Sequence, residues 1–175
     1  EQRIVDAYNA YLDTVAIDAK GLVPAYPYLT KIFEAPDLSA LADLWADPAY
    51  PHMVGAGVTI DSKDPDSYIP VIGFDGMGLP DRDMYLVDSE QNREFQSKYK
   101  QYLAFLLGKA GYSDPAATAE AVYAFEHKVA RIEWARAVLR NDDLTYNKLS
   151  RDELAALAPG FPIARLLDQG GLGKV

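Results

Sequence analysis

Only two histidines, His52 and His127, are available to this 175-residue chain for metal binding or proton transfer. A helical zinc site of the His-Glu-x-x-His kind needs two imidazoles one turn apart, because side chains at i and i+4 converge on one ion. Arg131 stands four residues after His127, and Met-Val-Gly-Ala follows His52. We therefore expect no metal ligand and no cofactor-binding residue in this chain, with His127 on a helix surface and His52 in a loop.

Two carboxylates, Glu126 and Glu133, lie seven residues apart and would share one face of a helix. Paired carboxylates can perform acid-base catalysis when one of them is desolvated, but a solvated helix face has the same spacing. The chain has no cysteine, and no G-x-S-x-G, P-loop or dinucleotide-binding pattern follows a predicted strand. The residues alone thus leave a carboxylate hydrolase open and assign no catalytic residue.

Composition limits the class of protein and its partners. Hydrophobic residues make up 49% of the chain, which favours one ordinary domain with a packed core over a disordered acidic segment. The formal net charge of -9 would repel phosphate backbones, so we expect no nucleic-acid partner. No apolar run approaches the length of a membrane span. The chain lacks an initiating Met and begins within a helical pattern, so we expect a piece of a longer polypeptide.

Apolar residues at spacings of three and four predict most of the secondary structure. The helices are expected over about residues 2–17, 28–33, 38–45, 89–110, 115–140 and 150–158. Asp37 or Ser39, Asp114 and Ser150 are candidate N-caps, and Ser150 with Glu153 forms a capping box. The expected buried stripe of the fifth helix contains Val122, Phe125, Val129, Ile132 and Leu139.

Between the third and fourth helices the apolar period changes to nearly two. Residues 53–74 therefore predict a two-stranded hairpin, with turn chemistry at Asp64-Pro65-Asp66 and with Pro70 at an edge or beside a bulge. We predict a mainly α fold, an irregular helical bundle with one inserted β-hairpin at about residues 53–74, and we treat residues 1–175 as a single segment.

The segment "GLPDRDMYL", residues 78–86, joins backbone-shaping residues to charged ones. Physically, Gly78-Leu79-Pro80 leads an extended chain out of the hairpin, Asp81 or Asp83 can cap a short turn, and Arg82 can reach a carboxylate or carbonyl. The segment resembles the "GLPDRDYY" signature of the neprilysin and endothelin-converting-enzyme family of zinc endopeptidases. Met84 stands where a second aromatic is common in that family, and Tyr85 keeps the other aromatic.

A second resemblance to the same family spans residues 125–161, "FEHKVARIEWARAVLRNDDLTYNKLSRDELAALAPGF". It contains a helix led by Glu126, then Trp134, a loop with Arg140, and the "TYN" motif with Tyr146 and Asn147. The aspartate-rich hairpin that precedes the first signature is also similar to the family pattern. The resemblance assigns these residues, together with Gly78 to Asp83 and Tyr85, a structural role.

The resemblance implies a two-lobed enzyme in which a helical lobe covers a zinc site in a C-terminal lobe. This chain looks like part of the N-terminal covering lobe, which encloses the substrate cavity. Its partners would be the C-terminal catalytic lobe of the same polypeptide and peptide substrates, with zinc bound outside this segment. The segment alone is expected to be inactive, and the family pattern implies an extracytoplasmic or periplasmic location. The alternative is an independent, non-catalytic helical module that binds another protein.

Overall fold

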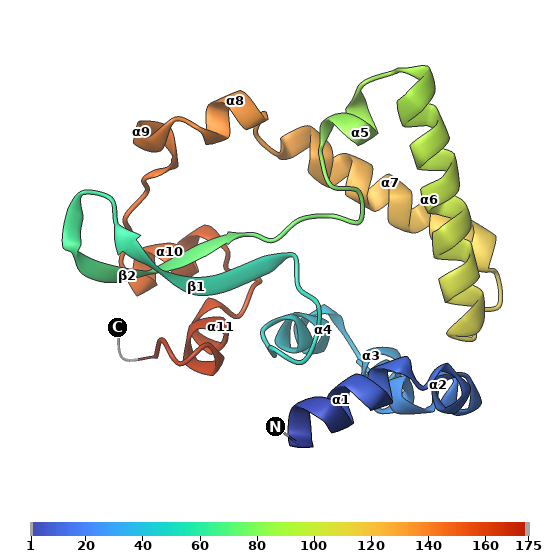
Figure 1. Ribbon diagram of the computed structural model, residues 1–175. Coiled ribbons are helices and arrows are strands. Elements are labelled where there is room, and N and C mark those ends of the chain that lie inside the picture. The colour runs from blue at the N-terminus through green and yellow to red at the C-terminus, as the bar shows by residue number, and fades with distance from the viewer. Residues whose placement is uncertain (1, 174–175) are drawn as a thin grey trace. The chain divides into compact units, whose positions relative to one another are not determined.

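The computed structural model describes residues 2–173, which divide into two compact units at Glu34 and Ala35. Within the described residues there are eleven α-helices and one sheet of two strands, so the prediction of a mainly α fold with one hairpin is confirmed (Figure 1). Among residues 2–173, no helix combines the length and apolar character that crossing a bilayer would need.

The first unit consists of short helices. They are α1 (Gln2–Leu12), α2 (Thr14–Lys20), the 3-10 helix η1 (Val23–Ala25) and α3 (Tyr26–Phe33). The prediction of one helix over residues 2–17 is wrong, because the chain leaves helical geometry at Asp13. The Asp13 carboxylate accepts the Ala16 N–H at 3.0 Å and so caps a new helix. This helix ends at Gly21, which is the C-cap of α2 and has a φ of 51°.

The second unit opens with α4 (Leu38–Trp45), whose N-cap is Asp37. The Asp37 carboxylate accepts the Ala40 N–H at 2.8 Å, which confirms one of the two predicted caps. This helix buries Ala42, whereas Leu38 is 82% exposed.

The hairpin pairs β1 (Val54–Asp61) with β2 (Asp64–Phe74) in antiparallel register, with Val54 opposite Phe74 and Val58 opposite Pro70. Each strand of a two-stranded sheet has a free edge, so the edge position predicted for Pro70 is confirmed. The turn lies at Ser62 and Lys63 rather than at Asp64-Pro65-Asp66. The Asp61 carboxylate accepts the Lys63 N–H at 2.9 Å, and this local bond closes the turn earlier than predicted.

The signature segment and two long helices form the next layer of this unit (Figure 1). A short helix, α5 (Asp83–Leu86), packs on both α6 (Glu90–Lys109) and α7 (Pro115–Ile132). Asp114 caps α7, as predicted, and Ser89 caps α6. The shared core contains buried Leu79, Tyr85 and Ala130, packed against partly buried Tyr99 of α6 and Tyr123 of α7 and against Met77, Met84 and Leu86.

The fifth predicted helix is shorter than expected, since α7 ends at Ile132 and a separate turn, α8 (Arg136–Leu139), follows. A continued α-helix would bond the Trp134 N–H to the Ala130 carbonyl. Arg82 donates its Nε–H to that carbonyl at 3.3 Å, and the backbone becomes extended at Glu133. A tertiary contact thus replaces the helical bond at this position.

The C-terminal part contains α9 (Asp142–Thr145), α10 (Arg151–Leu157) and α11 (Ile163–Gln169). The predicted capping box at the start of α10 is confirmed, with Ser150 and Glu153 bonded reciprocally. We did not predict α11, although Ile163, Leu166 and Leu167 follow helical spacing after Pro162. This helix forms a second core with the hairpin, in which Ile163, Leu167 and Leu172 pack against Ala56 and Ile72.

Candidate functional site

A buried carboxylate, that of Glu126 on α7, holds the start of the signature segment. Its Oε1 accepts the Gly78 N–H at 2.9 Å, and its Oε2 accepts the Tyr85 hydroxyl at 3.0 Å. The Tyr99 hydroxyl on α6 contacts both carboxylate oxygens, at 3.0 and 2.9 Å. Tyr85 also accepts the Leu79 N–H at 2.8 Å. Three segments far apart in sequence therefore meet at one acidic side chain.

Burial and the neighbouring carboxylate favour the neutral form of both tyrosines. Desolvation is the largest cause that raises the pKa of Tyr85, and the charge and hydrogen bond of Glu126 raise it further. The pKa of Tyr99 is raised in the same way, first by desolvation and then by its hydrogen bond to Glu126. Both hydroxyls therefore keep their protons and act as hydrogen-bond donors to the carboxylate.

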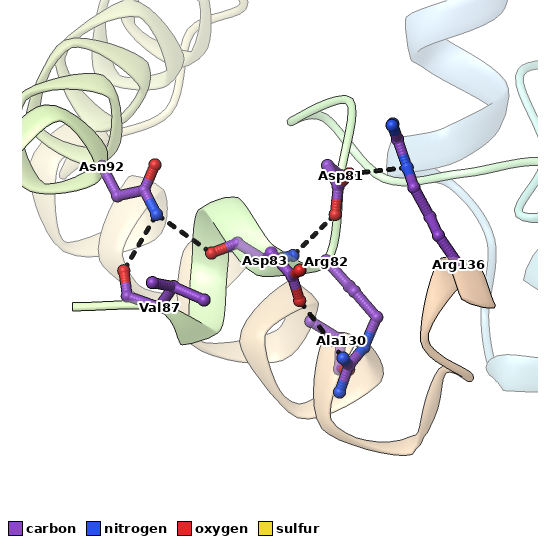
Figure 2. Close-up of polar contacts among 7 residues, drawn as sticks. All are labelled: Asp81, Arg82, Asp83, Val87, Asn92, Ala130 and Arg136. Carbon is purple, nitrogen blue, oxygen red and sulfur yellow. Dashed lines mark hydrogen bonds and ion pairs between the residues drawn. The ribbon is translucent and has the colours of Figure 1, made fainter. Parts of the chain in front are cut away.

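The charged part of the signature forms a corner around α5 (Figure 2). Asp81 accepts the Asp83 N–H at 2.8 Å and pairs with Arg136 at 2.7 Å. Arg82 pairs with Asp83 at 3.2 Å in addition to its bond to the Ala130 carbonyl. Asn92 on α6 donates to the carbonyls of Asp83, at 3.1 Å, and Val87, at 2.9 Å. Asn92 of α6 thus satisfies two carbonyls of the corner, and Arg82 joins the corner to α7 through the Ala130 carbonyl.

A second buried carboxylate fixes the tip of the hairpin. Asp61 is 1% exposed, and it accepts the Tyr146 hydroxyl and pairs with Lys148, each at 2.8 Å. The hydrogen bond from Lys148 is the largest cause that lowers the pKa of Asp61, which falls to about 2. Tyr146 belongs to the predicted "TYN" motif, whereas no pattern in the sequence identified Asp61 or Lys148 as its partners.

The remaining signature residues lie apart from these two networks. Trp134 is 47% exposed in the segment between α7 and α8. Arg140 is exposed at the end of α8 and forms no ion pair within residues 2–173. Asn147 donates its side-chain amide to the Leu144 carbonyl at 3.0 Å, a local bond that follows α9.

Glu126 and Glu133 do not form the carboxylate pair that the sequence left open. Glu133 lies beyond the end of α7, where the backbone is extended, so it does not continue the helix face of Glu126. Both Glu126 oxygens are occupied by hydrogen bonds from the protein. One oxygen of Glu133 is buried without a hydrogen-bond partner among the described residues, beside a pocket of about 280 Å³.

The histidines occupy separate environments and do not fit a zinc site. His52, in the loop before β1, lies 3.0 Å from Asp75 and 3.2 Å from the Tyr50 carbonyl. His127 on α7 is half-buried, with its ring 6.3 Å from that of Tyr123. Within residues 2–173 no three His, Cys, Asp or Glu side chains lie close enough to hold a metal ion.

The hairpin and the segment that follows α8 line a second hollow of this unit. It is a groove of about 910 Å³, and its walls are mainly apolar. Its apolar lining includes Ile60, Tyr68 and Ile72 from the strands and Leu154, Leu157 and Leu167 from the helices. Neither histidine lines this groove.

The sequence and fold are similar to those of known peptidases. The family described as Peptidase family M13 matches residues 1–175. Endothelin-converting enzyme 1 from Bos taurus is 32% identical over 107 residues, which cover 59% of this chain and 14% of the relative. Endothelin-converting enzyme-like 1 from Mus musculus is 28% identical over 118 residues, covering 64% of this chain and 15% of the relative.

Two structures of the zinc metalloprotease Zmp1 from Mycobacterium tuberculosis share the fold. The inhibitor complex superposes with a TM-score of 0.83 at 29% identity and covers 97% of this chain and 26% of the Zmp1 chain. The open state gives a TM-score of 0.81 at 30% identity and covers 96% of this chain and 27% of the Zmp1 chain. This chain therefore spans about a quarter of the length of Zmp1 and about a seventh of the converting enzymes.

Proposed function

The chain belongs to peptidase family M13, as an N-terminal segment of the neprilysin and endothelin-converting-enzyme type, and from that premise we propose that it is the covering part of a zinc metalloendopeptidase. In this proposal it encloses a substrate cavity, and the zinc ligands lie elsewhere in the polypeptide. The supporting observation is that 97% of this chain matches only 26% of a zinc metalloprotease. The C-terminal catalytic lobe would be its partner and peptides its substrates.

Enclosure contributes to catalysis by excluding water and large substrates from a reactive centre. The residues of this chain would act by fixing the positions of its helices and its hairpin. Glu126 ties the signature segment to both long helices, and Asp61 ties the hairpin tip to the "TYN" motif. We propose that all twelve signature residues have this structural role, including Trp134, Arg140 and Asn147.

The first test separates the covering role from catalysis within the chain. The purified 175-residue chain should contain less than stoichiometric zinc by elemental analysis and should leave an internally quenched peptide intact. Zinc near one equivalent together with chelator-sensitive cleavage would contradict the proposal. The parent gene should continue into a His-Glu-x-x-His segment, and its absence would favour the independent interaction module instead.

The second test addresses enclosure in the parent enzyme. Asp61→Ala should loosen the hairpin tip, so hydrolysis of a long, unstructured protein should rise relative to hydrolysis of a short peptide. Asp66→Ala, an exposed change on the same hairpin, is the matched control and should leave this ratio unchanged. If Asp61→Ala is folded and leaves this ratio unchanged, the hairpin tip does not contribute to enclosing the substrate cavity.

We also propose an extracytoplasmic or periplasmic location for the parent protein. The family resemblance supports this location. Fractionation of cells that produce the tagged parent protein tests it, and recovery of the protein wholly in the cytosol would contradict it.

A further inference from the structure

The outer edge of β2 carries main-chain groups that pair with no other strand within residues 2–173. Asp75 donates its N–H to the Met53 carbonyl at 2.8 Å, and these two residues continue the register of the hairpin. In an antiparallel pair, hydrogen-bonded and non-hydrogen-bonded positions alternate, so the N–H and C=O groups of every second residue point away from the partner strand. The main-chain groups of Tyr68, Pro70 and Ile72 therefore point to the free edge of β2.

The groove of about 910 Å³ runs along this edge. The side chains of a strand alternate between its two faces, so a hollow over one face would be lined by every second residue. All the residues from Tyr68 to Ile72 line the groove, whereas Ala56, Gly57 and Val58, which lie opposite on β1, do not. The groove therefore lies beside the edge of β2 rather than over one face of the sheet.

The opposite wall of the groove also has free main-chain groups. Residues 146–150 line the groove between α9 and α10 and form no helix or strand. Within residues 2–173, the main-chain N–H groups of Asn147, Lys148 and Leu149 donate no hydrogen bond, and no main-chain bond joins this segment to β2. The groove thus separates two stretches of backbone that both have unpaired donors.

An extended strand is the ligand that complements such a groove. A strand that adds to a sheet edge gains affinity from main-chain hydrogen bonds and specificity from the pockets that take its alternate side chains. The stretch of β2 along the groove is about 17 Å long, which is the length of a typical strand. Leu154 and Leu157 on α10 and Leu167 on α11 line the groove, and Leu157 is 71% exposed. One face of an inserted strand would cover these apolar side chains.

We propose that an extended segment of the C-terminal catalytic lobe of the same polypeptide occupies the groove and adds a third strand to the edge of β2. This inference rests on the proposed function, in which the chain covers such a lobe. The length of the relatives supports it, since 97% of this chain matches only 26% of the Zmp1 chain, so most of a Zmp1-like polypeptide lies outside residues 1–175. A tethered segment reaches its site at an effective concentration of up to about millimolar, which favours it over free peptides and over a second copy of the chain.

Amide hydrogen exchange in the parent enzyme and in the 175-residue chain tests this pairing. The N–H groups of Tyr68 and Ile72 should exchange at least about tenfold more slowly in the parent enzyme, because only there does a strand accept them. The N–H groups of Ile69 and Val71 point to β1 and are the internal controls, which should be protected in both proteins. Rapid exchange of Tyr68 and Ile72 in a parent enzyme that cleaves peptides would overturn this inference and leave the proposed function intact.

Two matched variants of the parent enzyme locate the inserted strand. Leu157→Asp, in the groove wall, should speed exchange of the Tyr68 and Ile72 N–H groups by about tenfold or more, because an inserted strand would bury the new charge. Ala155→Asp, an exposed change on the same helix outside the groove, should leave both groups protected. Unchanged protection in Leu157→Asp, with the control amides still protected, would overturn the proposal.

The same measurement excludes the other occupants of the groove. Protection of Tyr68 and Ile72 that appears only when a peptide is added would overturn the proposal, because a peptide ligand would then be the occupant. Protection that appears only at high protein concentration would also overturn it, because a second copy of the chain would then supply the strand.

Discussion

Gly78 and Tyr99 approach so closely that a side chain at position 78 has no room, since a Cβ there would lie 1.8 Å from the Tyr99 hydroxyl oxygen. The Gly78 N–H and the Tyr99 hydroxyl bind the same carboxylate, that of Glu126. The glycine thus lets the signature segment and α6 share one acceptor. Its φ is not in the left-handed region, so steric space rather than backbone freedom explains the residue.

Gly78→Ala should therefore destabilise the chain by about 1 to 3 kcal/mol, because overpacking must displace Tyr99 from its carboxylate. Urea unfolding followed by circular dichroism measures the change. Gly73→Ala on β2 is the matched control, since no atom lies within 4 Å of a Cβ built there. We expect the control to change the stability by less than about 0.5 kcal/mol. Equal effects of the two changes would contradict the close approach.

Removing the two buried hydroxyls should have unequal effects. Tyr99→Phe deletes a donor to a charged acceptor and should cost about 2 kcal/mol. Tyr85→Phe deletes such a donor and also the acceptor of the Leu79 N–H, so it should cost about 1 kcal/mol more. The free energies of unfolding in urea compare the two variants. A smaller loss for Tyr85→Phe would exclude the dual role of its hydroxyl.

Alkaline pH should weaken the same network. The pKa values of Tyr85 and Tyr99 are raised above 10.0 in the folded state, mainly by desolvation. The folded state therefore holds these protons more tightly, and the stability that this contributes is complete below pH 10 and lost as the pH rises beyond it. Urea midpoints between pH 8 and about 11 should fall for the wild type and fall less for the double variant Tyr85→Phe with Tyr99→Phe.

Acidic pH should release the hairpin tip. The pKa of Asp61 is lowered from 3.8 to about 2 in the folded state, first by its hydrogen bond from Lys148. The contribution of this carboxylate is present above the ordinary pKa and is lost as the pH falls through about 2. Proton NMR of the hairpin residues should follow this loss. In Lys148→Met the Asp61 pKa should return toward its ordinary value, and an unchanged titration would contradict the pair.

Phe125→Ala should cost less than about 1 kcal/mol, because the side chain is half exposed. The same substitution at a phenylalanine buried in a core would instead cost about 3 to 5 kcal/mol. Thermal or urea unfolding distinguishes these ranges. A loss in the larger range would mean that Phe125 is packed.

Local signals predicted the elements that carry them. Caps at Asp37, Asp114 and Ser150 start helices where the sequence predicts them, because each cap binds N–H groups within three residues. The period of two likewise identified the hairpin. The errors lie where a distant residue competes with a local bond. Arg82 donates a hydrogen bond to the Ala130 carbonyl and helps to end α7 early. The spacing of residues within that helix does not predict this contact.

The sequence by itself determined the mainly α class, the hairpin, the lack of a zinc-binding motif and the family, since composition, periodicity and ordered motifs are properties of the linear chain. Only the tertiary structure decided what the motifs contact. Glu126 could have been a solvated side chain or half of a catalytic pair, and it became an acceptor for three donors because folding brings residues 78, 85 and 99 to it. Such contacts depend on how helices pack, which spacing along one helix does not specify.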